Sequence, residues 1–126
     1  MSDQCQAYLE TIKLKLAITP IVTEVVILQE RHGDDAGFFR AQLWLVNGDF
    51  LEVAEFFRVV ANSVETIEYR YQWMDSTKRQ LRKRWDNAPH YPQLPNFPHH
   101  VADEIQVESG EPMSIVALID MLERQL

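Results

Sequence analysis

Residues 38–60 read FFRAQLWLVNGDFLEVAEFFRVV, and this stretch decides the fold. Two apolar runs flank Asn47-Gly48, a pair that tolerates the positive φ angles of a type I′ turn. Successive side chains of a strand point to opposite faces, so the first run places these four together: Phe39, Ala41, Leu43 and Leu45. We therefore predict an antiparallel hairpin of strands 38–46 and 50–60.

Further strands are predicted on both sides of this hairpin. Residues 21–30 alternate and are rich in β-branched side chains, which is typical of a largely covered strand. That pattern puts Val22, Val26 and Leu28 on one face. Residues 64–73 and 80–85 are predicted as the fourth and fifth strands, with a turn between them, although the charge of 80–85 also suits a helix.

Amphipathic helices are predicted at both ends, over 1–19 and 112–126, because apolar residues recur there every three or four positions. Short connections between the strands imply a β-meander, and helices at both ends imply that they cover one face of it. The expected fold class is α+β. We expect residues 1–126 to form a single domain, with the antiparallel sheet over 21–86 and a Pro/His-rich strap over 87–111.

Composition bounds the class of protein. The 126 residues suit one domain, and 46% hydrophobic residues are too many for intrinsic disorder. The longest apolar runs fall far short of the ~20 residues needed to cross a bilayer. Cys5 is the single cysteine and no secretory signal segment opens the chain, so a cytoplasmic location is expected. Phosphate-binding glycine loops and dinucleotide fingerprints are absent from the sequence.

Charge is distributed unevenly along the chain. The 12 Lys and Arg residues against 19 Asp and Glu give a net charge of −7, which disfavours indiscriminate binding of polyanions. Five of the 12 cations nevertheless lie within 78–84, a segment without an acid, and we call them the basic stripe: Lys78, Arg79, Arg82, Lys83 and Arg84. The stripe indicates either a local anionic partner or local salt bridges, and the sequence leaves both open.

The strap holds the most unusual composition. Four of the six prolines lie at 89, 92, 95 and 98, a period that matches the three residues per turn of polyproline II. An extended ribbon of this kind would lie against the body through Tyr91, Leu94 and Phe97. It also holds three of the four histidines: His90, His99 and His100.

These histidines are the candidate catalytic groups. Imidazole has an unperturbed pKa of about 6.5, so two histidines can act as base and acid near neutral pH. Arg84 could stabilise a phosphoryl charge and Asp86 could orient an imidazole. This set suits metal-independent cleavage of RNA. The structural alternative is a strap whose histidines only satisfy buried backbone groups.

Two further chemical readings concern metals and base stacking. The strap histidines with Asp86, Asp103 or Glu104 could bind zinc or manganese, but their spacing matches no established zinc pattern. We therefore predict no metal and no other cofactor. Tyr69 and Tyr71 could stack bases beside the basic stripe, or form the core face of the sheet. The candidate nucleic-acid-binding residues are Lys78, Arg79, Arg82, Lys83, Tyr69 and Tyr71.

Three runs, YRYQW at 69–73, RWDNAPH at 84–90 and FPHH at 97–100, resemble the TumE family of toxins from bacterial and archaeal toxin-antitoxin pairs. The similarity extends to Tyr8-Leu9-Glu10 and to the hairpin. It implies a small prokaryotic toxin of the cytoplasm that is neutralised by an antitoxin, usually a helix-turn-helix protein. Family members tend to carry a further histidine after the His-His pair, whereas this chain has Val101-Ala102-Asp103, so that histidine is not essential here.

The leading functional prediction is a toxin that acts on RNA or translation, with a ribonuclease site made of His90, His99, His100, Arg84 and Asp86. The alternative is a non-enzymatic interaction module that binds through the strap and the basic stripe. Expected partners are the antitoxin and RNA, without a membrane, and a homo-oligomer is left open. A histidine-dependent nuclease should lose turnover on both sides of a pH optimum, whereas a binding module has no turnover to lose.

Overall fold

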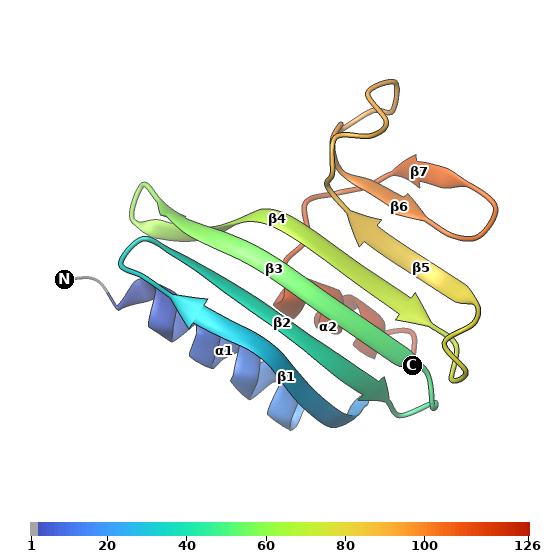
Figure 1. The fold of residues 1–126 in the computed structure, drawn as a ribbon, viewed down its shortest axis with the longest axis horizontal. Helices are drawn as coiled ribbons and strands as arrows, with labels where there is room; N and C mark the ends of the chain where they lie inside the picture. Colours follow the sequence, from blue (N-terminus) through green and yellow to red (C-terminus); the bar gives the residue numbers. More distant parts are fainter. Residues whose placement is uncertain (1–2) are drawn as a thin grey trace.

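A computed structural model describes residues 3–126. Its strands follow one another in chain order across a single antiparallel sheet (Figure 1), which confirms the α+β class and the meander. The elements are α1 (Gln4–Ile18), β1 (Val22–His32), β2 (Ala36–Leu45), β3 (Phe50–Val60), β4 (Ser63–Met74), β5 (Leu81–Asp86), β6 (His100–Ala102), β7 (Val107–Ser109) and α2 (Ile115–Glu123). Neither helix of this described part is long and apolar enough to cross a bilayer.

The sheet has seven strands in residues 3–126, so the prediction of about five was wrong. β6 and β7 lie inside the segment predicted as strap, and each has only three residues, too few to show a period in the sequence. β5 is a strand and not a helix. Of the helix predicted over 1–19, residues 1 and 2 lie outside the described residues.

The hairpin of β2 and β3 is confirmed, with Trp44 opposite Phe50 at its closed end. Its turn differs from the predicted type I′, because only Gly48 has a positive φ, of 91°, and its N–H donates to the carbonyl of Leu45. This is the three-residue loop that places glycine in the left-handed region. The two consecutive positive φ angles of a type I′ turn occur instead at Ala61 and Asn62, between β3 and β4.

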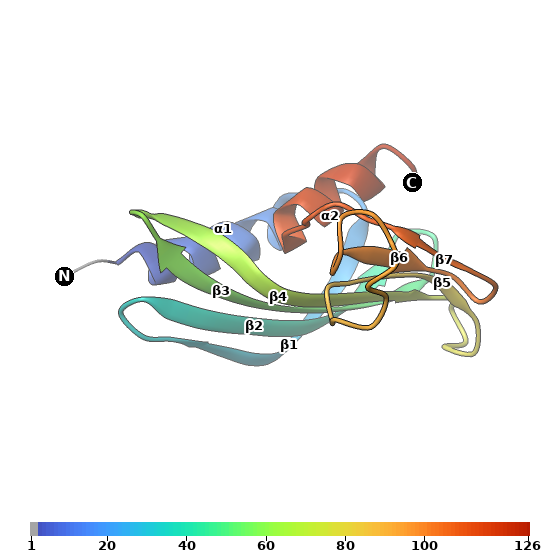
Figure 2. The ribbon, with the colours of Figure 1, turned by 90° about the horizontal axis from the view of Figure 1, so that it is seen from above.

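Both helices lie on the same side of the sheet, as Figure 2 shows. We call this side the helix face. Its strand side chains form one buried core with α1 and α2. From the strands the core takes Phe39, Ala41, Leu43, Leu45, Leu51, Val53, Phe57, Tyr69, Tyr71 and Trp85, and from the helices Cys5, Leu9, Ile12, Leu16, Ile115, Leu118, Ile119 and Leu122. The opposite side, the open face, carries the alternate residues and no helix.

β1 is an edge strand of the sheet and is not the covered strand that its sequence predicts. Val26, Ile27 and Leu28 are exposed. The pairing with β2 shifts between Val22 and Glu24 and again between Ile27 and Gln29, so the predicted common face of Val22, Val26 and Leu28 is broken. A strand at the sheet edge has one neighbour, and apolar composition alone does not reveal this position.

A buried carboxylate joins the two helices to the sheet. Glu55 on β3 is fully buried, and its Oε2 accepts hydrogen bonds from the hydroxyls of Tyr8 in α1 and Thr66 in β4. Its Oε1 accepts the N–H of Ile115, 2.9 Å away, at the start of α2. Burial raises the pKa of Glu55, and burial together with that carboxylate raises the pKa of Tyr8.

Two tyrosines of β4 anchor the segment that leads into α2. The hydroxyl of Tyr71 donates to the carbonyl of Met113 at 2.8 Å, and that of Tyr69 donates to the carbonyl of Glu111 at 3.2 Å. Both rings are buried and stack on each other with centroids 5.2 Å apart. The prediction that Tyr69 and Tyr71 stack on bases is therefore wrong, because their alternation places them in the core.

Replacing Glu55 tests this anchorage. Glu55→Ala should lower the free energy of unfolding by about 3 kcal/mol, because it leaves a cavity and removes the acceptor of three donors. Glu55→Gln should cost less, because the amide oxygen still accepts one hydrogen bond and both hydroxyls can turn to accept from its NH₂ group. Urea denaturation of the three proteins measures the differences.

The raised pKa of Glu55 can be tested by comparing the stability of wild type and Glu55→Gln at a series of pH values. A raised pKa means that the folded state favours the protonated carboxyl, so wild-type stability falls as pH rises from about 4.5 through the raised value. The glutamine side chain of the variant does not titrate. The difference in unfolding free energy between wild type and Glu55→Gln should therefore change across that window, and a constant difference would contradict the raised pKa.

Candidate functional site

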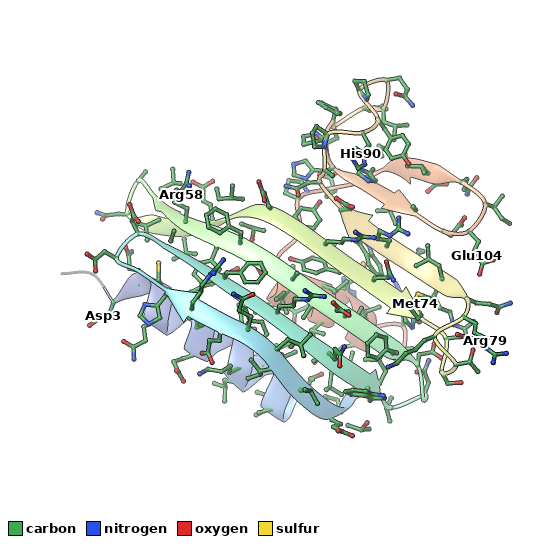
Figure 3. All side chains as sticks on the ribbon, viewed as in Figure 1. Asp3, Arg58, Met74, Arg79, His90 and Glu104 are labelled. Atoms are coloured by element: carbon green, nitrogen blue, oxygen red, sulfur yellow. The ribbon has the colours of Figure 1, made fainter. Side chains whose placement is uncertain are left out.

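Many polar side chains lie on the open face of the sheet (Figure 3), and the sheet register aligns some of them in a row from β2 to β6. Successive partners in the sheet register are Arg40, Ala54, Arg70, Asp86 and His100. The adjoining row holds Gln42, Glu52, Gln72, Arg84 and Ala102. Both rows follow from the period of two, because each of their members alternates with side chains buried on the helix face.

Two arginines of these rows share a neutral acceptor. Arg70 and Arg84 each donate to the amide oxygen of Gln72, at 3.4 and 3.3 Å. Arg40 is different, because its Nε donates to the carboxylate of Glu52 at 2.9 Å. Within residues 3–126 no carboxylate forms an ion pair with Arg70 or Arg84. Both guanidinium groups can therefore still form charge-assisted hydrogen bonds with an anionic ligand.

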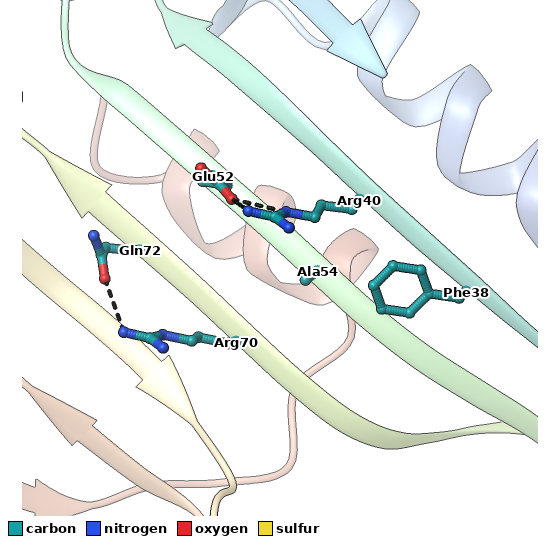
Figure 4. Close-up of a pocket in the computed structure, with 6 residues that line it drawn as sticks. All are labelled: Phe38, Arg40, Glu52, Ala54, Arg70 and Gln72. Carbon is teal, nitrogen blue, oxygen red and sulfur yellow. Dashed lines mark hydrogen bonds and ion pairs between the residues drawn. The ribbon is translucent and has the colours of Figure 1, made fainter. Parts of the chain in front are cut away.

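The open face is hollowed around Ala54. One recess there has a volume of about 420 Å³. Figure 4 shows its lining residues, with Arg70 and Gln72 on one side and Arg40 and Glu52 on the other. A second recess of about 450 Å³ shares Phe38, Ala54 and Arg70 with it. It continues to Asp86 and His90.

Asp86 and two strap histidines lie on the open-face side of the molecule. Asp86 is buried, and its Oδ1 accepts the N–H of Ala88 at 2.6 Å. His100 lies opposite Asp86 in the register, and its Nδ1 is 2.9 Å from the carbonyl of Pro98. His90 is exposed at the second recess. The rings of His90 and His100 both meet that of Tyr91 edge-on, with centroids 6.2 and 4.9 Å away.

His99 lies on the helix face instead. Its Nδ1 is 3.0 Å from the hydroxyl of buried Tyr69, and the two rings stack with centroids 5.9 Å apart. Partial burial lowers the pKa of His99. His99 is therefore separated from the other predicted catalytic residues. The structure brings four of the five to the open face: Arg84, Asp86, His90 and His100.

The strap is a series of tight turns and not a polyproline II ribbon. Leu94 and His99 donate their N–H groups to the carbonyls three residues earlier. Asn96 adopts a positive φ of 65°, which interrupts the extended backbone, and its side chain donates to the carbonyl of Gly110 at 2.6 Å. Phe97 is 43% exposed, so the prediction that it packs against the body was wrong.

The basic stripe does not form one surface. Arg82 donates to buried Asp49 at 3.0 Å, which is the local salt bridge that the sequence left open. Lys78 lies over an aromatic ring of β3, 4.2 Å from its centroid. Arg79 and Lys83 are exposed, and Lys83 pairs with a residue of the helix face. Alternation along β5 places Lys83 and Arg84 on opposite faces, and Lys78 and Arg79 lie in the turn before that strand.

The structure also bears on the alternative metal reading. In the described residues, no three His, Cys, Asp or Glu side chains gather in a group that could hold a metal ion. Asp103 accepts the N–H groups of Ile105 and Gln106 in its own turn. Glu104 is exposed beside that turn.

Among the residues of the open-face site that sequence reasoning missed are Arg70, Gln72 and Ala54. Arg70 and Gln72 alternate with the two tyrosines of β4, so a correct assignment of the tyrosines to the core places both on the opposite face. That signal was present in the sequence. The hollow over Ala54 gives no such signal, because it depends on which side chains face it from neighbouring strands.

One family model, described as Toxin TumE, matches residues 11–126 of the chain. The match spans both rows of the open face and the strap, and it confirms the resemblance found in the sequence. No curated protein and no solved structure matches the chain.

Proposed function

Because the chain belongs to the TumE toxin family, we propose that it is a toxin that acts on RNA held across the open face. The observation that carries this proposal is the pair of guanidinium groups on Gln72, which have no carboxylate partner within residues 3–126. Guanidinium groups match the geometry of phosphate oxygens and bind them with two hydrogen bonds. A phosphodiester bridging Arg70 and Arg84 would supply the missing negative charge.

The surroundings of that pair suit a nucleic-acid chain. Phe38 and Phe56 face each other across β2 and β3 and line the second recess. Aromatic rings beside cations are the usual elements of single-strand binding, because every base offers a face for stacking. His90 lies at the far side of the same recess, where it can reach a bound strand.

We propose metal-independent phosphoryl transfer at this site. His90 takes the proton of a ribose 2′-hydroxyl, and the 2′-oxygen attacks the adjacent phosphorus. The bond from phosphorus to the 5′-oxygen breaks, and His100 donates a proton to that leaving oxygen. The products are a 2′,3′-cyclic phosphate and a 5′-hydroxyl. Arg70 and Arg84 offset the charge of the phosphorane.

Membership of this toxin family implies a partner antitoxin. We propose that the partner is of the helix-turn-helix type and that it neutralises the toxin by covering the open face. We propose that it acts in the cytoplasm, where cellular RNA is found. A purely non-enzymatic toxin, which binds its target without turnover, is an outcome of the experiments below.

The arginine pair is tested by charge removal. Arg70→Gln and Arg84→Gln should each weaken RNA binding and lower the slope of log affinity against log salt by about 0.7 to 1, because fewer counterions are released. Each should also relieve growth arrest in cells that express the chain without antitoxin.

Two controls accompany these variants. Arg124→Gln removes one charge at the end of α2, and the double variant Arg40→Gln with Glu52→Gln removes an ion pair of the open face without changing net charge. Both should keep the wild-type salt slope. Equal loss in Arg124→Gln and Arg70→Gln would show that net charge, not the open-face pair, sets the affinity.

The proposed chemistry is tested with purified protein, RNA and excess EDTA. His90→Ala should reduce cleavage by on the order of 10²-fold or more, the usual effect of losing a general base, and wild-type cleavage should show a bell-shaped pH profile. His99→Asn alters a histidine of the helix face and should keep cleavage within a fewfold. If His90→Ala cleaves like wild type, His90 is not the base. Toxicity without any cleavage would favour the non-enzymatic alternative.

A further inference from the structure

The second recess is large enough to hold one planar ring. Ala54 forms its floor, and larger side chains surround it: Phe38, Phe56, Glu68, Arg70, Asp86 and His90. Its volume of about 450 Å³ falls within the range of sites for small molecules, about 300 to 1,000 Å³. Any longer side chain in place of Ala54 would fill the floor.

Two phenyl rings line the recess, and stacking on them would stabilise any of the four bases without distinguishing one from another. Phe38 and Phe56 are direct partners in the register, and both are half-buried. Arg31 and Arg58 lie over these rings, 5.5 and 5.4 Å from the centroids, and add positive charge at this end of the open face. Stacking on aromatic rings accepts every base. A preference for one base must therefore come from the polar residues that line the recess, which we call the polar wall: Glu68, Arg70, Asp86 and His90.

The polar wall includes the carboxylate of Glu68, whose oxygens can accept hydrogen bonds from a ligand. Glu68 lies opposite Phe56 in the register and two residues before Arg70 on the same face. Its carboxylate is exposed and has no hydrogen-bond or ion-pair partner in the described part of the chain. An ionised carboxylate accepts hydrogen bonds and cannot donate, so it favours a base edge that carries donors.

We propose that this recess binds a guanine base of the RNA and that Glu68 recognises it. Guanine alone presents a ring N1–H beside an exocyclic N2 amino group, two adjacent donors that match the two carboxylate oxygens. Adenine and cytosine place an acceptor nitrogen beside their amino group, and uracil flanks its single N–H with two carbonyls. This inference rests on the proposed function, because the base enters the recess on a strand whose phosphate lies at Arg70.

The experiment measures equilibrium binding of the full chain to short 2′-O-methyl oligonucleotides, which lack the nucleophilic 2′-hydroxyl. The probes are an all-uridine strand and the same strand with one central guanosine, inosine, adenosine or cytidine. The guanosine strand should bind at least about tenfold more tightly than the all-uridine strand. Inosine keeps N1–H and lacks the amino group, so it should lose most of that gain.

Variants locate the preference in the recess. Ala54→Leu fills the floor and Glu68→Gln removes one acceptor, so each should bring the guanosine-to-uridine affinity ratio close to one. Gln42→Leu is the control for Ala54→Leu, because it introduces leucine on the same face but outside the recess. It should keep the wild-type guanosine-to-uridine affinity ratio. Equal wild-type affinity for all five strands would overturn the guanine assignment while leaving the proposed function standing. A preference that survives both recess variants would also overturn it, and no binding to any strand would overturn both.

Discussion

The position of both helices on one face of the sheet is the constraint on which the rest of the structure depends. Glu55 accepts hydrogen bonds from α1, β4 and the first turn of α2, so one buried carboxylate fixes three elements around β3. Tyr69 and Tyr71 add two hydrogen bonds to the backbone that precedes α2. Tyr69 and Tyr71 lie on the helix face. Because strand side chains alternate, Arg70 and Gln72 therefore lie on the open face.

The uncovered side therefore combines features that a core would not tolerate. Two guanidinium groups share one amide oxygen, a carboxylate stands without a partner within residues 3–126, and a small residue opens a hollow between larger ones. Buried, such groups would each cost free energy. Exposed on a rigid sheet, they remain available to a ligand, and the strap adds His90 at the edge of the same surface.

Local patterns in the sequence were sufficient for the hairpin of β2 and β3, the two helices and the α+β class, because alternation and amphipathic spacing involve only neighbouring residues. The three-residue strands β6 and β7 and the edge position of β1 were not predictable in this way, because they depend on pairing with distant segments. For the proposed site, Arg84, Asp86 and His90 were predicted from their clustering in the chain, and the structure places them on the open-face side. The separation of His99 from His100 follows from the start of β6 between them, which no local pattern marks.

The central claim is that RNA binds across the open face, and NMR mapping tests it most directly. Titrating isotope-labelled protein with an uncleavable 2′-O-methyl strand should shift the amide signals of β4, β5 and residues 86–91, while signals of α1 and α2 on the far side stay in place. Shifts confined to α1, α2 or the exposed edge of β1 would contradict the account and would place the RNA elsewhere on the molecule.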